Sequence, residues 1–302
     1  MRERLSNLIS EFAKRDPRAI VLSGDHGYAL FDEIRRNCSS QFINVGVMEQ
    51  AMVGMAAGLA KTGALPIVYG LSAFVPIRVL EQIKLDVCYS NLPVIFLGDG
   101  AGLVYTTLGS SHQCAEDIAA LRPMPNIQIY SPADEQELVV CFNEAIASKA
   151  PCYIRIGKSD RPVVHSKPLA STEPVRLHEA SKKVCLVSSG SMTSIAQEAA
   201  KRFKLSHYCL PRLKPFPREW VKSILPDFER VIVIEEHSRF GGVCSALMDA
   251  ACEAGIRPPL MTSLSLQDKF ADKCGSYQYA LSEHGMNDEQ ILSRVQVLVE
   301  GS

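Results

Sequence analysis

Short apolar runs alternate with helical patterns along this 302-residue chain, and this alternation restricts its fold more than any other feature. The runs are apolar along their whole length and are bounded by glycine, proline or polar residues. Strands without a polar face are typical of parallel sheets that helices cover on both sides. We therefore expect an α/β fold, with strands at 19–22, from 42, at 65–69, 92–97, 127–130, 184–187 and 231–236.

The alternation stops after Gly157 and resumes at Val184. The residues between are polar, contain prolines and show no sustained periodicity. A single core tends to stop growing near ~250 residues, so a chain of this length favours two domains. We expect a first domain at 1–163, a linker at 164–183 and a second domain at 184–302.

Composition narrows the class of protein. With 47% hydrophobic residues, 22% charged residues and a net charge of −1, the chain lacks the basic surface that nucleic-acid binding requires. The ten cysteines form neither a C-x-x-C pair nor a zinc-like cluster, which indicates free thiols in a reducing compartment. No run has the length of a signal peptide core or a membrane span, so we expect a cytoplasmic protein.

Glu49 stands just past an apolar strand and a glycine turn, at the start of a helix of small residues that is too apolar to face water. Acids are common in the first turn of any helix, because the macrodipole favours them there. An open α/β sheet, however, binds its ligands at the carboxyl ends of its strands. A buried carboxylate at that edge is able to share a proton with a ligand nitrogen.

Two further residues follow strands in the same half. His112 lies on a loop of glycine and serine that opens the next helix, where imidazole can exchange protons with an alkoxide, although a lone histidine is usually structural. Phe74 is compatible with an ordinary core residue, but its aromatic face can also stack on a flat heterocycle.

These segments, in this order, resemble the pyrimidine-binding half of thiamine-diphosphate enzymes of the transketolase family, which includes the deoxyxylulose-phosphate synthases. The resemblance covers almost the whole chain. The matching motifs are N-V-G-V-M-E-Q at 44–50, S-A-F-x-x-x-R-x-x-E-Q-I at 72–83, A-G-L-V…G-S-S-H-Q at 101–113, M-P-N-I-Q-I-Y-S-P-A-D-E-Q-E at 124–137, K-P-F at 214–216, E-E-H-S-R-F-G-G-V at 235–243 and H-G-M-N-D at 284–288. The resemblance implies a parallel pyrimidine-type domain followed by a transketolase C-terminal-like α/β domain.

The resemblance also implies roles. The residue matching Glu49 hydrogen-bonds N1′ of the aminopyrimidine and drives formation of the imino tautomer, which removes the thiazolium C2 proton to give the ylid. Phe74 would stack on the pyrimidine with Tyr69 nearby, and His112 would handle protons at the substrate. Asp25 and Arg78 complete the implied cofactor-binding set. The implied activity is transfer of a two-carbon ketol or acyl unit between sugar-like substrates, within carbohydrate metabolism.

Members of this family also need a diphosphate-binding half, in which an Asp and an Asn hold Mg²⁺ after a G-D-G turn. Gly98-Asp99-Gly100 and Asn126 imitate this motif, but they lie inside blocks that already match the pyrimidine domain. We therefore expect no metal ligand in this chain. A partner subunit would hold Mg²⁺ and the diphosphate, in an α2β2 heterotetramer, because family active sites form at subunit boundaries.

Some positions depart from the family pattern. Leu108 replaces an aspartate that recognises a sugar hydroxyl, and Gly100 replaces an arginine of the synthases. Lys158 follows Arg155 where a second phosphate-binding arginine is usual, and a lysine lacks the bidentate fork. Leu108, His112, Arg155 and Lys158 form the expected substrate site, with a deoxy or unphosphorylated sugar as the hypothesised substrate; the two cations are also compatible with exposed charges at a domain edge.

Two other functions stay open at this point. The β subunit of a 2-oxoacid dehydrogenase E1 shares the two-domain layout and the glutamate, although the S-H-Q loop favours transketolase-like chemistry. A non-catalytic regulatory paralogue would keep the fold without activity. The presence of Glu49, Phe74 and His112 argues against a decayed site.

Overall fold

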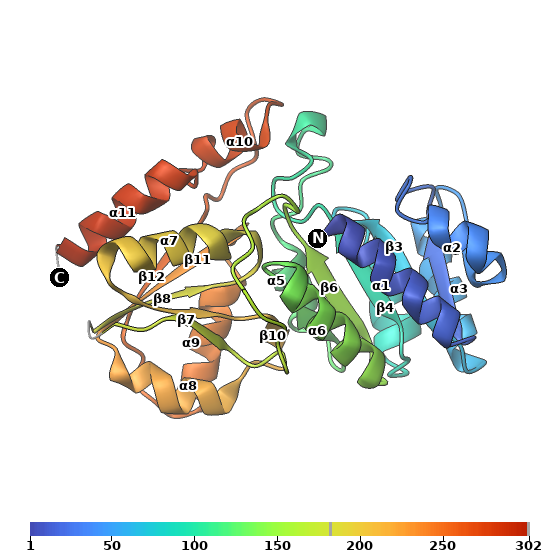
Figure 1. Cartoon of the computed structure of the whole chain (residues 1–302), viewed down its shortest axis with the longest axis horizontal. Coiled ribbons are helices and arrows are strands. Elements are labelled where there is room, and N and C mark those ends of the chain that lie inside the picture. Colours follow the sequence, from blue (N-terminus) through green and yellow to red (C-terminus); the bar gives the residue numbers. More distant parts are fainter. Residues whose placement is uncertain (181–182, 301–302) are drawn as a thin grey trace.

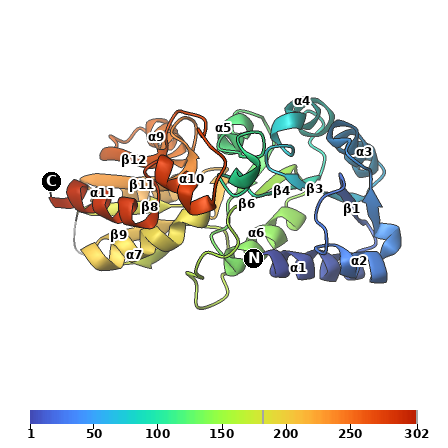
Figure 2. The ribbon, with the colours of Figure 1, turned by 90° about the horizontal axis from the view of Figure 1, so that it is seen from above.

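The computed structural model describes residues 1–180 and 183–300, which form two α/β domains side by side along the long axis of the molecule (Figure 1 and Figure 2). Each domain is a mainly parallel sheet between layers of helices. This architecture confirms the α/β fold that the uniformly apolar strands predicted.

The first sheet has seven strands in the order β10-β5-β6-β4-β3-β1-β2, and only β10 runs antiparallel to its neighbour. Its strands are β1 (Ala19–Ser23), β2 (Phe42–Asn44), β3 (Leu65–Leu71), β4 (Ile95–Asp99), β5 (Gln128–Tyr130), β6 (Cys152–Ile156) and β10 (Arg212–Lys214). Its helical segments are α1 (Arg2–Arg15), α2 (Asp32–Asn37), η1 (Ser39–Gln41), α3 (Glu49–Lys61), η2 (Ile77–Val79), α4 (Leu80–Gln82), the π-helical η3 (Ile83–Cys88), η4 (Thr106–Leu108), α5 (Asp117–Leu121) and α6 (Glu135–Ala147).

The second sheet has five strands in the order β12-β11-β8-β9-β7, and β7 is antiparallel to β9. Its strands are β7 (Val175–His178), β8 (Val184–Ser188), β9 (Ser206–Cys209), β11 (Arg230–Ser238) and β12 (Leu260–Leu266). Its helical segments are η5 (Gly190–Met192), α7 (Thr193–Phe203), α8 (Arg218–Ile224), η6 (Leu225–Asp227), α9 (Val243–Glu253), α10 (Tyr277–Glu283) and α11 (Asp288–Glu300). No helix in the described ranges is long and apolar enough to cross a bilayer.

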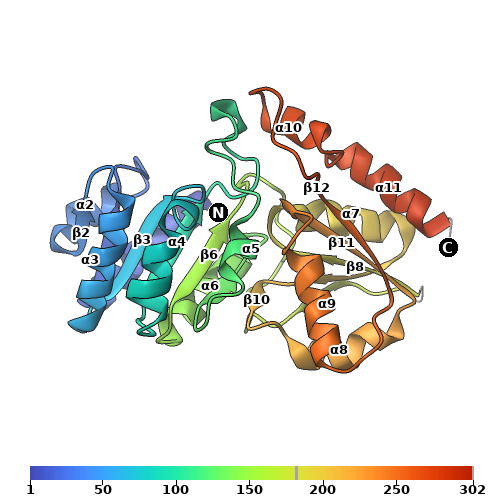
Figure 3. The same cartoon turned by 180° about the vertical axis from the view of Figure 1, so that it is seen from behind.

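Successive strand residues point to opposite faces, so each sheet has two cores. On the first sheet, α1, α2 and α6 cover one face, and α3, α4 and α5 cover the other. The second of these cores continues under α8 and α9 of the second domain, which lie on the same side in Figure 3. The opposite face of the second sheet packs against α7, α10 and α11.

Two short strands depart from the expected domain organisation. Strand β7 falls inside the expected linker, where it pairs with β9, while linker residues 181 and 182 lie outside the described residues. Strand β10 falls in the expected second domain but extends the first sheet by pairing with β5. Both strands are too short and too polar to show a periodicity. Because β10 pairs with a strand of the first sheet, it connects the second domain to the first.

Candidate active site

Four loops that follow neighbouring parallel strands meet at one edge of the first sheet. The loop after β1 carries His26, and the turn after β2 leads into Glu49 at the start of α3. The segment after β3 carries Phe74 and Arg78, and the long loop after β4 carries His112. Ligands of open α/β sheets bind at the carboxyl ends of the strands, so this edge is the expected place for a site.

Glu49 is nearly enclosed, with 4% of its side chain exposed. Its Oε1 accepts a hydrogen bond from Arg78 Nη1 at 3.1 Å, and His26 Nε2 lies 3.7 Å from the same oxygen. No hydrogen bond within the described residues reaches Oε2. The carboxylate therefore has one engaged oxygen and one that is free to meet a ligand.

Phe74 lies at the centre of this group of residues. Its ring is edge-on to His112, with centroids 5.2 Å apart, and tilted against His26 at 5.7 Å. The Arg78 guanidinium covers its face, with Cζ 3.9 Å from the ring centroid. The planar guanidinium of Arg78 thus lies on the aromatic face and donates a hydrogen bond to Glu49. An aminopyrimidine is expected to contact the same two groups.

His26 is the pocket residue that the sequence reasoning missed. The segment Gly24-Asp25-His26-Gly27 follows β1 directly, and this position after a buried parallel strand is the signal that could have identified it. Asp25 has φ +63° and is exposed at the rim, where its N–H donates to Asn44 Oδ1 at 3.0 Å. A positive φ in a residue other than glycine is uncommon and marks a constrained loop.

The structure does not place Tyr69 in this pocket, although it was expected beside the cofactor. Its side chain is 1% exposed, packs edge-on against Phe31 and donates from Oη to Asp99 Oδ2 at 2.7 Å. Burial, together with the charge of Asp99, raises the pKa of Tyr69 far above its ordinary value. Tyr69 points to the α1 side of the sheet, so it is a core residue.

Asp99 and Asn126 are both engaged structurally, which supports treating the G-D-G segment as an imitation of the metal motif. Asp99 accepts from Tyr69 and from Tyr105, and Asn126 donates to the Cys88 carbonyl at 2.8 Å. Within residues 1–180 and 183–300, no cluster of three or more His, Cys, Asp or Glu side chains is placed to hold a metal ion.

Arg155, which was expected in the substrate site, is enclosed between the two domains. It is 3% exposed and donates from Nε to both oxygens of the fully buried Asp117, at 2.8 and 3.1 Å. Its Nη2 donates to the Glu236 carbonyl of the second domain at 2.7 Å. The guanidinium is therefore engaged at the domain interface, and the alternative of an exposed charge at a domain edge is wrong for Arg155.

The other two expected substrate residues are accessible. Leu108 is 55% exposed in η4, on the same projecting loop as His112, and this loop contacts α10. Lys158 is half-buried, pairs with Asp160 at 3.0 Å and lies 5.6 Å from the Tyr277 ring centroid. Among these residues, the described contacts bring only His112 to the Phe74 pocket.

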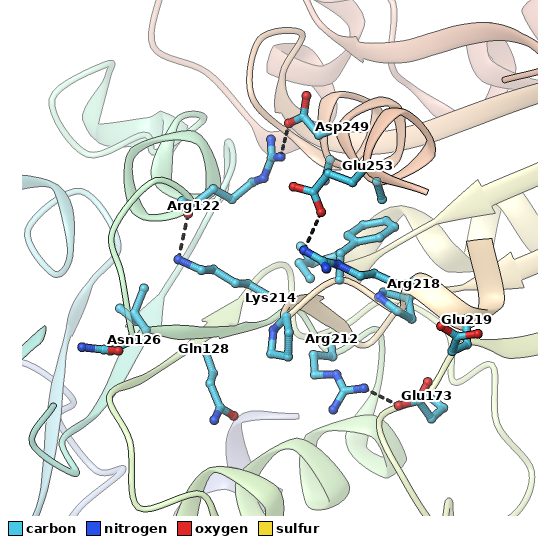
Figure 4. Close-up of a pocket in the computed structure, with 17 residues that line it drawn as sticks. Arg122, Asn126, Gln128, Glu173, Arg212, Lys214, Arg218, Glu219, Asp249 and Glu253 are labelled. Carbon is cyan, nitrogen blue, oxygen red and sulfur yellow. Dashed lines mark hydrogen bonds and ion pairs between the residues drawn. The ribbon is translucent and has the colours of Figure 1, made fainter. Parts of the chain in front are cut away.

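A separate cavity of about 650 Å³ lies between the domains near β10 (Figure 4). Its charged walls are already paired: Arg122 with Asp249 at 2.5 Å, and Arg218 with Glu253 at 2.5 Å. Lys214 donates to the backbone carbonyls of Arg122 and Met124. None of the expected site residues lines this cavity, so it is distinct from the pocket around Glu49.

The pocket itself fits a flat, nitrogen-rich ring. It offers an aromatic face on Phe74 and, within residues 1–180 and 183–300, two atoms without a hydrogen-bond partner: Glu49 Oε2 and the buried Nε2 of His26. These are complementary to the faces and edges of an aminopyrimidine. These contacts concern the pyrimidine end of thiamine diphosphate, and the expectation that a partner subunit holds Mg²⁺ and the diphosphate stays a prediction.

Comparisons with known proteins agree with this geometry. The pyrimidine-binding domain of transketolase matches residues 1–163, and the C-terminal domain of transketolase matches residues 174–266. The chain is 30% identical to one of the subunits of the apulose-4-phosphate transketolase of Actinobacillus succinogenes, over 83% of both proteins. It is 33% identical to 1-deoxy-D-xylulose-5-phosphate synthase of Cupriavidus necator, covering 84% of this chain but only 41% of the synthase.

Solved structures give the same result. A split-gene transketolase, solved as an inactive β4 tetramer, matches with a TM-score of 0.85 at 28% identity and covers 98% of this chain and 96% of that chain. Transketolase of Leishmania mexicana matches with a TM-score of 0.82 at 20% identity, where this chain spans 45% of that protein and the likeness concerns the fold alone. The expected family resemblance is thereby confirmed, and the chain belongs to the transketolase family, of which it carries the pyrimidine-binding and C-terminal domains.

Proposed function

We propose that this chain is one subunit of a split, thiamine-diphosphate-dependent transketolase, which transfers a two-carbon ketol unit between sugar-like substrates. The observation that carries the proposal is the buried Glu49 carboxylate beside the Phe74 ring at the carboxyl edge of a parallel sheet. When bound, thiamine diphosphate supplies the electron sink for cleaving a bond next to a carbonyl group. The chain supplies the position and the proton partners of its pyrimidine ring.

Each pocket residue has a role that follows from its position. Glu49 shares a proton with a ring nitrogen through its free oxygen, in surroundings where water is excluded. Phe74 stacks on the ring once Arg78 has moved from its face. His112 lies against the Phe74 edge on a half-exposed loop, where its imidazole can exchange a proton with a substrate hydroxyl or carbonyl oxygen.

The partner subunit would complete the site. We expected α3 to be covered because it is so apolar, yet in the isolated chain one of its faces lies exposed, including Met55 at 43%. The adjoining turn exposes Val47 at 69% and Met48 at 50%, and Tyr28 is 89% exposed nearby in the loop after β1. Exposed apolar side chains of this kind beside a site are typical of an interaction surface. It supports docking of a subunit that brings Mg²⁺ and the diphosphate site, in an α2β2 assembly.

The substrate site supports a preference for sugars without a terminal phosphate. Leu108 offers no hydrogen bond to a sugar hydroxyl, and Arg155 is enclosed with Asp117. Lys158 is then the remaining cation among the four expected substrate residues, and it already pairs with Asp160. Phosphorylated and unphosphorylated ketoses should be compared as donors; a strong preference for sugar phosphates, such as the one that gives the Actinobacillus relative its name, would refute this part.

The function is tested with the chain co-purified with its partner subunit. Glu49→Gln keeps the shape and an acceptor for Arg78 but cannot share the proton, so turnover should fall about 10²- to 10⁴-fold while the complex stays assembled. Near-normal turnover of this variant would show that the proton role is wrong. Reductive acetylation of a lipoyl domain by the wild-type complex would instead favour a 2-oxoacid dehydrogenase.

A further inference from the structure

The roles proposed above do not involve His26, and they do not explain the surroundings of its side chain. Its Nε2 is buried, has no hydrogen-bond partner among the residues that the structure describes, and lies 3.7 Å from Glu49 Oε1. Buried polar atoms are nearly always hydrogen-bonded, so such an atom indicates a contact that forms in another state of the site. Any role of His26 at this site rests on the proposed function, because it concerns the same residues.

The loop holds this imidazole firmly. The Ser23 hydroxyl donates to the His26 carbonyl at 2.7 Å and accepts from the His26 N–H at 3.2 Å. Gly27 has φ +73°, and a Cβ there would lie 2.5 Å from the Phe31 ring, so this turn requires glycine. Asp25 is fixed from the other side by Asn44. The ring of His26 is therefore presented to Glu49 by a constrained backbone.

Arg78 is the present donor to Glu49, but it occupies the place of the cofactor ring. A pyrimidine that stacks on Phe74 must displace the guanidinium, which now lies 3.9 Å from the ring centroid. The charged or titratable groups around His26 are Asp25 on its own loop, Glu49 on α3, Arg78 on η2 and, across Phe74, His112. Once Arg78 leaves, His26 Nε2 is a donor only 3.7 Å from Oε1.

We propose that His26 is a positioning residue for Glu49. In the cofactor-bound pocket, Nε2–H of His26 donates to Glu49 Oε1, which a shift of about 0.8 Å brings within hydrogen-bond distance. Anchoring Oε1 directs Oε2 toward the ring nitrogen, so the carboxylate that shares the proton is held in one orientation. His26 acts through Glu49 and itself takes no part in the bond changes.

The test uses the assembled complex of this chain with its partner subunit. His26→Leu removes the donor, His26→Gln keeps an N–H donor of similar reach, and His26→Met is a second apolar variant in case the first fails to fold. His178→Leu, at the far sheet edge in β7, is the matched control. The measurements are the dissociation constant for thiamine diphosphate by calorimetry and the exchange rate of its C2 proton by NMR.

We expect both apolar variants to slow C2 exchange about 10- to 100-fold, as loss of a hydrogen bond to a charged group implies. Their affinity for thiamine diphosphate should change less than about fivefold, and His26→Gln should restore exchange to within about threefold of wild type. Wild-type exchange in the apolar variants overturns the proposal. Exchange in His26→Gln as slow as in His26→Leu also overturns it, because the ring shape would then matter rather than the donor.

Glu49→Gln, measured in parallel, separates this proposal from the function on which it rests. If Glu49→Gln exchanges slowly and His26→Leu exchanges normally, the glutamate role stands and the role of His26 falls. If Glu49→Gln exchanges normally, the proton role of the glutamate is wrong, and the proposal for His26 falls with it.

Discussion

Replacing Arg155 with methionine should destabilise the fold by about 3–5 kcal/mol, because it leaves a charge buried without its partner. Asp117 is fully buried and receives two hydrogen bonds from Arg155 Nε, and one from Tyr153 Oη at 2.7 Å. Methionine fills most of the volume of the arginine stem but offers no donor. The Glu236 carbonyl of the second domain also loses its bond from Arg155 Nη2.

A second substitution separates the charge from the packing. In the double variant Arg155→Met, Asp117→Asn, the unpaired charge is gone, and the amide oxygen still accepts from Tyr153. The double variant should therefore be more stable than the sum of the two single variants predicts, by about 1–3 kcal/mol. This coupling energy isolates the ion pair from the loss of the hydrogen bond between domains.

The assay is urea unfolding of the chain at neutral pH, with Arg122→Met as the control. Arg122 pairs with Asp249 at 2.5 Å, but Asp249 is 66% exposed, so loss of this pair should cost about 1 kcal/mol or less. A cost below about 1 kcal/mol for Arg155→Met would refute the reasoning. Unchanged stability together with a raised KM for sugar phosphates would return Arg155 to the substrate site.

Three further predictions follow from the pocket and the domain junction. Arg78→Leu should tighten thiamine diphosphate binding to the complex about 5- to 20-fold by calorimetry, because it removes a half-exposed guanidinium that competes for the Phe74 face; weaker binding would make Arg78 a cofactor ligand. Burial raises the pKa of Asp134, but hydrogen bonds from His165 and backbone N–H groups lower it to about 2, from an ordinary 3.8. Its contribution of about 2 kcal/mol is therefore present above about pH 4 and lost as the pH falls toward 2. Asp134→Ala should accordingly cost more at pH 7 than at pH 2.5 in denaturant titrations; an equal cost at both would contradict this. Gly102→Ala should lower the melting temperature far more than Gly63→Ala, since both have positive φ but only at Gly102 would a Cβ meet Glu236 Oε1, at 2.3 Å.

The position of the site could be predicted from the sequence because the geometry of the site follows from the order of the strands in the sheet. Glu49, Phe74 and His112 each follow a strand, and neighbouring parallel strands end at one edge, so their convergence needed no knowledge of side-chain packing. Tyr69 was misplaced for a related reason. A strand that is buried on both faces gives no polar alternation to show which of its residues face which layer, and Tyr69 points to the α1 side.

Other contacts depend on residues far apart in the chain. Arg155 lies in a strand whose residues are all buried, which indicates an ion pair rather than an exposed ligand site, but Asp117 is 38 residues away and no spacing rule names it. His26 reaches Glu49 only because two loops on neighbouring strands, β1 and β2, lie in a particular register. Such contacts come from the packed fold and are not encoded in any local pattern.

The exposed face of α3 connects the site to the proposed assembly. A helix that begins with the buried Glu49 and exposes Met55 six residues later extends from the site onto an uncovered apolar surface. A partner that covers this surface would also close the site, because the exposed Val47 and Met48 directly precede Glu49 in the chain. If the cofactor is bound by both subunits at once, its affinity and the stability of the complex are linked by mass action. Folding of this chain and formation of its active site are then separate events, and the second requires the partner.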